Sequence, residues 1–93
     1  MPRFFIEVPH DAEVVACARV VESFLNYGSH FTTQADWGCQ DGEHKAWIVI
    51  EAENKEEART ILPPAFQSQA KIVQLNKFSM EDIAEILESH RHD

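Results

Sequence analysis

The sequence predicts a single α+β domain of four strands and two packed helices, followed by a third helix. Strand-like and helix-like segments alternate along the chain, with no linker, internal repeat or low-complexity segment between them. Asp41-Gly42 stands between two strand-like segments, which is a strong hairpin signal. Because the chain has 93 residues, it can form one domain at most, and a second copy would add core that so small a domain lacks.

The first strand and the first helix carry clear end signals. Residues 3–8 (RFFIEV) are rich in β-forming side chains and are followed by Pro9. Asp11 is the expected N-cap of a helix over residues 12–27, where apolar side chains recur at helical spacing. Gly28 is expected to end this helix.

Residues 30–37 and 44–52 are predicted to form the second and third strands, joined by a type I′ turn at Asp41-Gly42. This turn fixes the register, and the predicted pairs are Gln40 with Glu43, Cys39 with His44, Trp37 with Ala46, and Ala35 with Ile48. One face of the hairpin then becomes mostly apolar and should lie under the helices. Its members are Phe31, Thr33, Ala35, Trp37, Cys39, His44, Ala46, Ile48, Ile50 and Ala52.

A second helix and a fourth strand follow the hairpin. Asn54 is the expected N-cap of a helix over residues 55–62, with Glu57 in the position of a capping-box partner. Pro63-Pro64 ends or bends that helix. Residues 70–78 are predicted as the fourth strand, with the side chains of Val73 and Leu75 directed toward the helices and those of Ile72, Gln74, Asn76 and Phe78 directed away.

Ser79 begins a C-terminal helix that extends to residue 90, and residues 91–93 form a frayed tail. The preceding order β-α-β-β-α-β is typical of the ferredoxin-like split βαβ arrangement. That arrangement has an antiparallel sheet with strand order 4-1-3-2 and both main helices on one face. An unrelated α+β meander is the alternative.

Charge and cysteine content exclude several classes of protein. The formal net charge is −8 and the eight basic residues are scattered, so we expect no nucleic-acid partner and no anionic membrane. Cys17 and Cys39 are too few for a disulfide scaffold, which favours a reducing compartment. An acid at Glu7 leaves no room for a signal-peptide core, and no apolar run is long enough to span a bilayer. The expected location is the cytoplasm.

The sheet face away from the helices is predicted to be unusually apolar for a solvent-facing surface. We expect it to carry Phe5, Glu7, Thr32, Gln34, Asp36, Trp47, Val49, Ile72, Gln74 and Asn76. A patch of this kind usually marks an interface or a ligand site. The sequence therefore predicts a homodimer with a semi-polar cleft for a small molecule, and the candidate ligand-binding residues are Phe5, Thr32, Gln34, Trp47, Gln74 and Asn76.

This pattern resembles the dimeric α+β barrel superfamily, which includes muconolactone-isomerase-like proteins and many small bacterial domains of unknown function. The resemblance covers the four strand segments RFFIEV, HFTTQADW, HKAWIVIEA and AKIVQLNKF and the two helices between them. It implies a homodimer formed through the open sheet faces. It rests on element order and face chemistry, and no catalytic residue can be transferred from the family.

A second hypothesis is a cofactor-independent enzyme, such as an isomerase or a decarboxylase. Glu7 is expected in mid-strand beside Phe5 and Trp47, and an apolar neighbourhood raises a carboxyl pKa toward the range of general acid–base catalysis. His10 and Asp36 are its candidate catalytic partners. Each residue also has a competing interpretation. Glu7 would be an interfacial residue paired with a lysine, His10 an ordinary surface histidine, and Asp36 a simple dimer contact.

A third hypothesis is a metal site, although no cofactor is expected from any established motif. Cys39 and His44 are predicted cross-strand neighbours, and His10 at the end of the first strand reaches the same sheet edge. A divalent ion would need three or four such ligands. The competing interpretation, which the spacing favours, is a hydrated hairpin tip. Cys17 lies on the apolar stripe of the first helix and is predicted to be a core residue.

Overall fold

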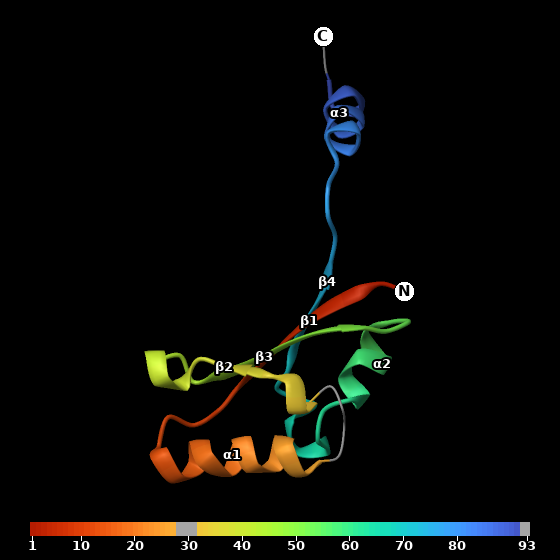
Figure 1. Ribbon diagram of the computed structural model, residues 1–93. Helices are drawn as coiled ribbons and strands as arrows, with labels where there is room; N and C mark the ends of the chain where they lie inside the picture. The colour runs from red at the N-terminus through yellow and green to blue at the C-terminus, as the bar shows by residue number, and fades with distance from the viewer. Residues whose placement is uncertain (28–31, 92–93) are drawn as a thin grey trace.

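The computed structural model describes residues 1–27 and 32–91, and it is an α+β fold. Figure 1 shows its helices and strands, which are β1 (Arg3–Pro9), α1 (Val14–Asn26), β2 (Asp36–Trp37), β3 (Lys45–Glu51), α2 (Lys55–Thr60), β4 (Lys71–Leu75) and α3 (Met80–Ser89). Three single turns of 3-10 helix lie between them, at Thr32–Gln34, Cys39–Asp41 and Pro64–Phe66.

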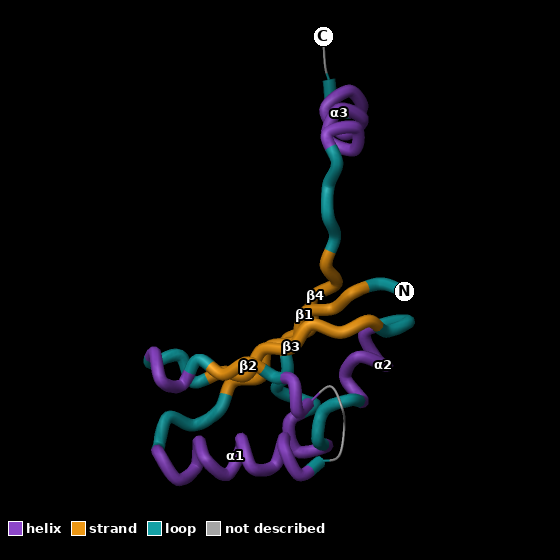
Figure 2. Tube along the Cα trace, in the orientation of Figure 1, coloured by secondary structure: helices purple, strands orange, loops and turns teal. Residues whose placement is uncertain are grey.

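The four strands form one antiparallel sheet in the order β2-β3-β1-β4, which confirms the predicted order (Figure 2). In Figure 1, α1 and α2 lie on the same side of this sheet. The alternating side chains of β1 and β3 on that side are buried against the two helices. The core consists of Phe4, Ile6, Val8, Phe24, Ala46, Ile48, Ile50, Ala52, Ala58, Leu62, Ala70 and Ile72.

The hairpin has the predicted register but not the predicted turn. Trp37 stands opposite Ala46, as expected, and Asp36 stands opposite Trp47. A type I′ turn needs two residues with positive φ, whereas Gly42 is the one described residue with positive φ, at 85°. The connection is instead a longer loop over residues 38–44 that contains a 3-10 turn. The predicted pairs of Gln40 with Glu43 and of Cys39 with His44 therefore lie in this loop, beyond the ladder.

The second strand is much shorter than predicted. Only Asp36 and Trp37 pair with β3, and the segment before them is the 3-10 turn at Thr32–Gln34. Thr32 is 1% exposed, and its hydroxyl donates a hydrogen bond to the carbonyl oxygen of Phe24 at 3.1 Å. This buried hydrogen bond stabilises the turn, so the predicted positions of Thr32 and Gln34 on the open sheet face are wrong.

The fourth strand directs the opposite set of side chains toward the helices from the set predicted. Ile72 pairs with Ile6 and is buried, whereas Val73 pairs with Phe5 and is 37% exposed. The strand carries apolar side chains in both alternations, and the partner register on β1 decides between them. Gln74 stands opposite the buried Phe4, so its predicted place on the open face is wrong. Asn76 follows the strand, so it is not part of the sheet.

The helix caps are partly as predicted. Asn54 accepts a hydrogen bond from the Glu57 amide, and Ser79 forms a capping box with its N3 residue, so both predicted N-caps are confirmed. The prediction for α1 is wrong, because Glu13 is its N-cap and accepts from the Ala16 amide at 2.8 Å. Asp11 instead accepts from the Glu13 amide, outside the helix. Gly28, His30 and Phe31 lie outside the described residues.

The C-terminal helix projects away from the rest of the molecule (Figures 1 and 2). Residues 76–79 continue from the end of β4 to the start of α3 at Met80. The described fold measures 59 × 28 × 20 Å, with a radius of gyration of 17.1 Å. A compact chain of this length would have a radius of gyration of about 12 Å. The projecting segment is therefore a separate arm, and we define the C-terminal arm as residues 76–91.

None of the described helices combines the length and the apolar composition that crossing a bilayer requires.

Candidate metal centre

Four nitrogen- and sulfur-bearing side chains meet at the edge of the sheet where β1 ends and β3 begins. His10 follows β1, Cys17 lies in α1, Cys39 begins the 3-10 turn of the hairpin loop, and His44 precedes β3. Their potential ligand atoms all lie within 4.8 Å of one another. We refer to these four residues as the Cys2His2 cluster.

Backbone contacts hold three of these positions in place. The His10 amide donates a hydrogen bond to the His44 carbonyl oxygen at 3.0 Å, which extends the β1–β3 ladder beyond the strands. The 3-10 turn is closed by the Gly42 amide, which donates to the Cys39 carbonyl oxygen at 3.1 Å. Within this turn Cys39 lies on the helix side of the sheet, where its sulfur contacts Cys17 of α1.

The cluster is tightly connected at its centre. His10 Nε2 lies 3.1 Å from the Cys39 sulfur and 3.3 Å from the Cys17 sulfur. The two sulfurs are 3.3 Å apart, and both cysteines are free. The His10 and His44 rings pack edge to face, with centroids 5.8 Å apart. Around a tetrahedral zinc ion, ligand atoms would be separated by about 3.3–3.8 Å. The observed spacing needs only small outward shifts to admit such an ion.

Burial shifts the pKa of two members of the cluster, His10 and Cys39. Burial, followed by the positive charge that His44 can carry, lowers the pKa of His10 below its ordinary value, so its imidazole is neutral near pH 7. Burial and the contact with Cys17 raise the pKa of the Cys39 thiol. The Nδ1 atoms of both histidines are buried and have no hydrogen-bond partner. A neutral imidazole with an unpartnered nitrogen is the form in which histidine binds a metal, and His10 fits this description.

Aromatic side chains form one wall of the cluster and connect it to the core. The Trp37 ring packs edge to face against His10 at 5.6 Å and against Phe24 at 5.1 Å. On the other sheet face, a Cβ atom on Gly38 would lie 2.6 Å from the ring of Trp47. Glycine at this position therefore allows the loop to pass Trp47 closely and carry Cys39 to the cluster.

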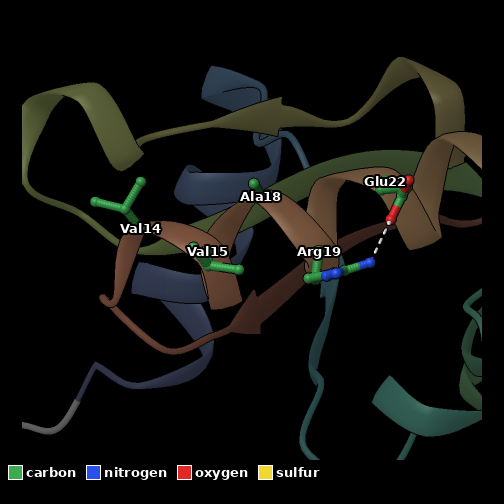
Figure 3. Close-up of a pocket in the computed structure, with 5 residues that line it drawn as sticks. All are labelled: Val14, Val15, Ala18, Arg19 and Glu22. Carbon is green, nitrogen blue, oxygen red and sulfur yellow. Dashed lines mark ion pairs between the residues drawn. The ribbon is translucent and has the colours of Figure 1, made fainter.

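Two shallow pockets flank α1. One, of about 390 Å³, opens beside the cluster and is lined in part by Cys17, Val21, Trp37, Cys39 and Gln40, so solvent can reach the sulfur side. The other, of about 380 Å³, lies along Val14, Val15, Ala18, Arg19 and Glu22, and Figure 3 shows these side chains on a single helix. The second pocket has an exposed Arg19–Glu22 ion pair at 3.7 Å and no convergent group from another element.

The predicted catalytic residues lie on two sides of the sheet. Glu7 accepts a hydrogen bond from Trp47 Nε1 at 3.0 Å on the open face. It stands in one cross-strand row with Trp47, Asp36 and Lys71. His10 lies in the cluster on the helix side, so the structure does not bring it together with Glu7. Of the predicted ligand-binding residues, Phe5 and Trp47 lie on the open face.

The structure places the three predicted metal ligands together and adds Cys17. The sequence placed Cys17 on the apolar stripe of α1, which is correct about its face but says nothing about what lies opposite. The signal that could have identified it is that Cys17 is the sulfur-bearing member of a stripe that otherwise consists of Val14, Val21, Phe24 and Leu25.

No protein-family model matches this chain, and no curated protein or solved structure is significantly similar to it. The resemblance to dimeric α+β barrels therefore stays a prediction.

Proposed function

We propose that this protein is a small metal-binding domain that holds one zinc ion on His10, Cys17, Cys39 and His44. The observation that carries the proposal is the convergence of four ligand atoms within 4.8 Å of one another, from four separate segments of the chain. A hydrated hairpin tip gives no reason for Cys17, which belongs to a helix, to contact Cys39 and His10 at 3.3 Å.

The donor set favours zinc among the common divalent ions. Two thiolates and two imidazoles are ligands that zinc accepts in tetrahedral geometry, whereas magnesium and calcium require oxygen donors. Monovalent copper also accepts thiolates and is the principal competitor. With four protein ligands no coordination position remains for water, so this site is structural or regulatory, not hydrolytic.

The ion joins α1 to the hairpin loop. One end of α1 is anchored by Phe24, which is fully buried, whereas Val14 and Val15 at its other end are exposed. Cys17 lies about one turn from that exposed end, so its coordination fixes the part of the helix farthest from the Phe24 anchor. Metal occupancy thereby controls the order of α1 and of the pocket beside it.

Metal loading of the purified full-length protein tests this proposal directly. Native mass spectrometry should detect one zinc ion per chain, and cobalt should give the visible absorption of tetrahedral cobalt with thiolate ligands. Cys17→Ser and Cys39→Ser should each remove the thiolate absorption and weaken zinc binding by at least tenfold.

A matched control is His90→Ala, which removes an exposed histidine from the C-terminal arm and should leave stoichiometry and spectrum unchanged. Zinc binding that survives in both cysteine variants would refute the proposed ligand set. A cobalt spectrum without thiolate character would do the same.

We further propose a ferredoxin-like arrangement for the fold, supported by its strand order. Small-molecule binding over the open sheet face and acid–base chemistry by Glu7 stay predictions.

A further inference from the structure

The C-terminal arm carries an apolar surface that packs against nothing in the described chain. Met80, Ile83 and Leu87 recur at helical spacing along α3, and Met80 and Leu87 are 83% and 66% exposed. Ile86 and Phe78 widen this surface and are also exposed. A ten-residue helix is marginal in water without a packing partner. The structure therefore presents a helix that needs a surface to cover it.

The open sheet face is the matching uncovered surface. The strand register places Phe5, Val49 and Val73 side by side in one cross-strand row, and Val49 is 56% exposed. Leu75 and Trp47 lie on the same face. Neither α1 nor α2 contributes to this face, because both pack on the other side of the sheet (Figure 1).

We propose that the C-terminal arm of each protomer docks on the open sheet face of a second copy, and that two such contacts related by a two-fold axis form a homodimer. The inference is independent of the metal site, which lies at the opposite end of β1 from the point where the arm leaves the sheet, since Leu75 pairs with Arg3.

Chain direction favours a second copy over the arm's own sheet. Residues 76–79 run on from β4 and away from the domain (Figure 2). To cover its own sheet, the helix would have to reverse within this segment (Asn-Lys-Phe-Ser), which contains neither glycine nor proline. Exchange between protomers uses the arm in its extended direction and gives an isologous contact.

Charge favours the open face as the docking surface. The helix carries Glu81, Asp82, Glu85 and Glu88 and no cation, and these acids lie opposite its apolar stripe, where they stay hydrated. Against a chain of net charge −8, the outward residues of the four strands include three cations, Arg3, Lys45 and Lys71, beside three acids, Glu7, Asp36 and Glu51. The ion pairs found within residues 1–27 and 32–91 involve none of these cations. The charged side chains of this face therefore balance, so it repels the acidic helix less than a surface with the average charge of the chain would.

The size of the contact also fits a stable dimer. Each protomer would contribute its arm and the outward residues of three strands, roughly two dozen residues, and stable interfaces use about 20–30 residues a side. A sheet-on-sheet dimer would leave both arms uncovered.

Sedimentation velocity on the full-length protein and on two double variants tests the proposal. The wild type should sediment as a dimer. An arm variant (Ile86→Glu with Leu87→Glu) and a sheet variant (Val49→Glu with Val73→Glu) should each sediment as monomers, because each loses both contacts. Glu85→Gln, on the acidic side of the same helix, is the matched control and should remain dimeric.

Mixing the two double variants distinguishes arm exchange from other dimers. A heterodimer of arm variant and sheet variant retains one intact contact, so the mixture should recover dimer that neither variant forms alone. Circular dichroism should confirm that both variants are folded, as expected for substitutions at exposed positions.

Amide hydrogen exchange of the wild type supplies a second measurement that requires no variant. Protection of residues 80–89 should rise with protein concentration. A monomeric wild type, or protection independent of concentration, would overturn the proposal in favour of an arm folded on its own sheet. An arm variant that remains fully dimeric would also overturn it, in favour of a sheet-on-sheet dimer.

Discussion

The two ends of β1 differ in how the chain is held around them. At the C-terminal end, four segments meet in the Cys2His2 cluster, and aromatic packing through Trp37 continues from it into the core. At the N-terminal end, where Arg3 pairs with Leu75, a single segment leaves the sheet and carries α3 into solvent. One end of β1 is closed by side chains of the same chain, whereas the other end leads to a helix whose apolar side chains Met80, Ile86 and Leu87 are exposed.

This difference shows that helix formation and helix packing are separate questions. The helix α3 has a complete capping box and a clear apolar stripe, whereas α1 has a single-residue cap and an exposed first turn at Val14 and Val15. Yet of these two helices it is α1 that contacts the core, through Phe24. Local signals decide where a helix begins, and tertiary contacts decide what it packs against.

The largest expected effect comes from removing the core anchor of α1. Phe24→Ala should lower the free energy of unfolding by about 3–5 kcal/mol, because a fully buried ring that packs against Trp37 and Phe66 would leave a cavity. Chemical denaturation should measure this loss. Val14→Ala, in the same helix but 79% exposed, is the control and should change stability by no more than about 0.5 kcal/mol. Equal effects would mean that α1 is not anchored at Phe24.

The next effect is stabilisation of the cluster end by metal. Zinc at about a thousandfold excess over its Kd should raise the free energy of unfolding by about 4 kcal/mol, because the ion binds the folded state preferentially. Thermal denaturation with and without a chelator should measure the shift. The Cys17→Ser variant should show little of this zinc-dependent stabilisation. If hydrogen exchange showed equal zinc-induced protection of α1 and α3, the contrast between the two ends would fail.

A smaller effect is expected at the loop that carries Cys39. Gly38→Ala should cost about 1–3 kcal/mol, because its new Cβ atom would lie 2.6 Å from the Trp47 ring and 2.8 Å from the Glu43 carbonyl oxygen. Zinc affinity should fall together with this stability, because the same loop carries Cys39. Gly42→Asn is the control, since nothing lies within 4 Å of that position and asparagine tolerates positive φ. A variant at residue 38 as stable as the wild type would show that the loop moves freely past Trp47.

The smallest effect concerns the cap of the arm. Ser79→Ala should destabilise α3 by about 1 kcal/mol and leave the sheet unaffected, as read from amide exchange of residues 80–89. Hydrogen bonds from the Ser79 amide and hydroxyl group lower the pKa of Asp82 below its ordinary value of 3.8. The pKa of Asp82 is therefore lower in the folded protein than in the unfolded chain. The stabilisation that ionised Asp82 contributes is present above pH 3.8 and is lost as the pH falls through the pKa of the folded protein. Asp82→Asn should abolish this acid fraying, and a variant that frays as before would exclude Asp82 as its cause.

The hairpin register could be predicted because it depends on a local pattern, and the strand order because the element order β-α-β-β-α-β is typical of one sheet arrangement. Alternation along β1 and β3 is strict, and a turn centred on Asp41-Gly42 sets Asp36 opposite Trp47 whether two residues or seven form the connection. The orientation of β4 could not be predicted in the same way. Ala70 and Ile72 compete with Val73 and Leu75 as its apolar alternation, and only pairing with β1 selects the first pair.

The sequence by itself determined the N-caps of α2 and α3 and the hairpin register, because each follows from neighbours in the chain, and it offered three of the four members of the cluster as candidates. Only the tertiary structure decided that Cys17 completes the cluster and that α3 projects into solvent. Helical spacing defines a face of α1 but not the loop that lies against it, and a capped amphipathic helix does not specify the surface that will cover it. Both depend on contacts between segments far apart in the chain, whose positions are set by the packing of the whole domain.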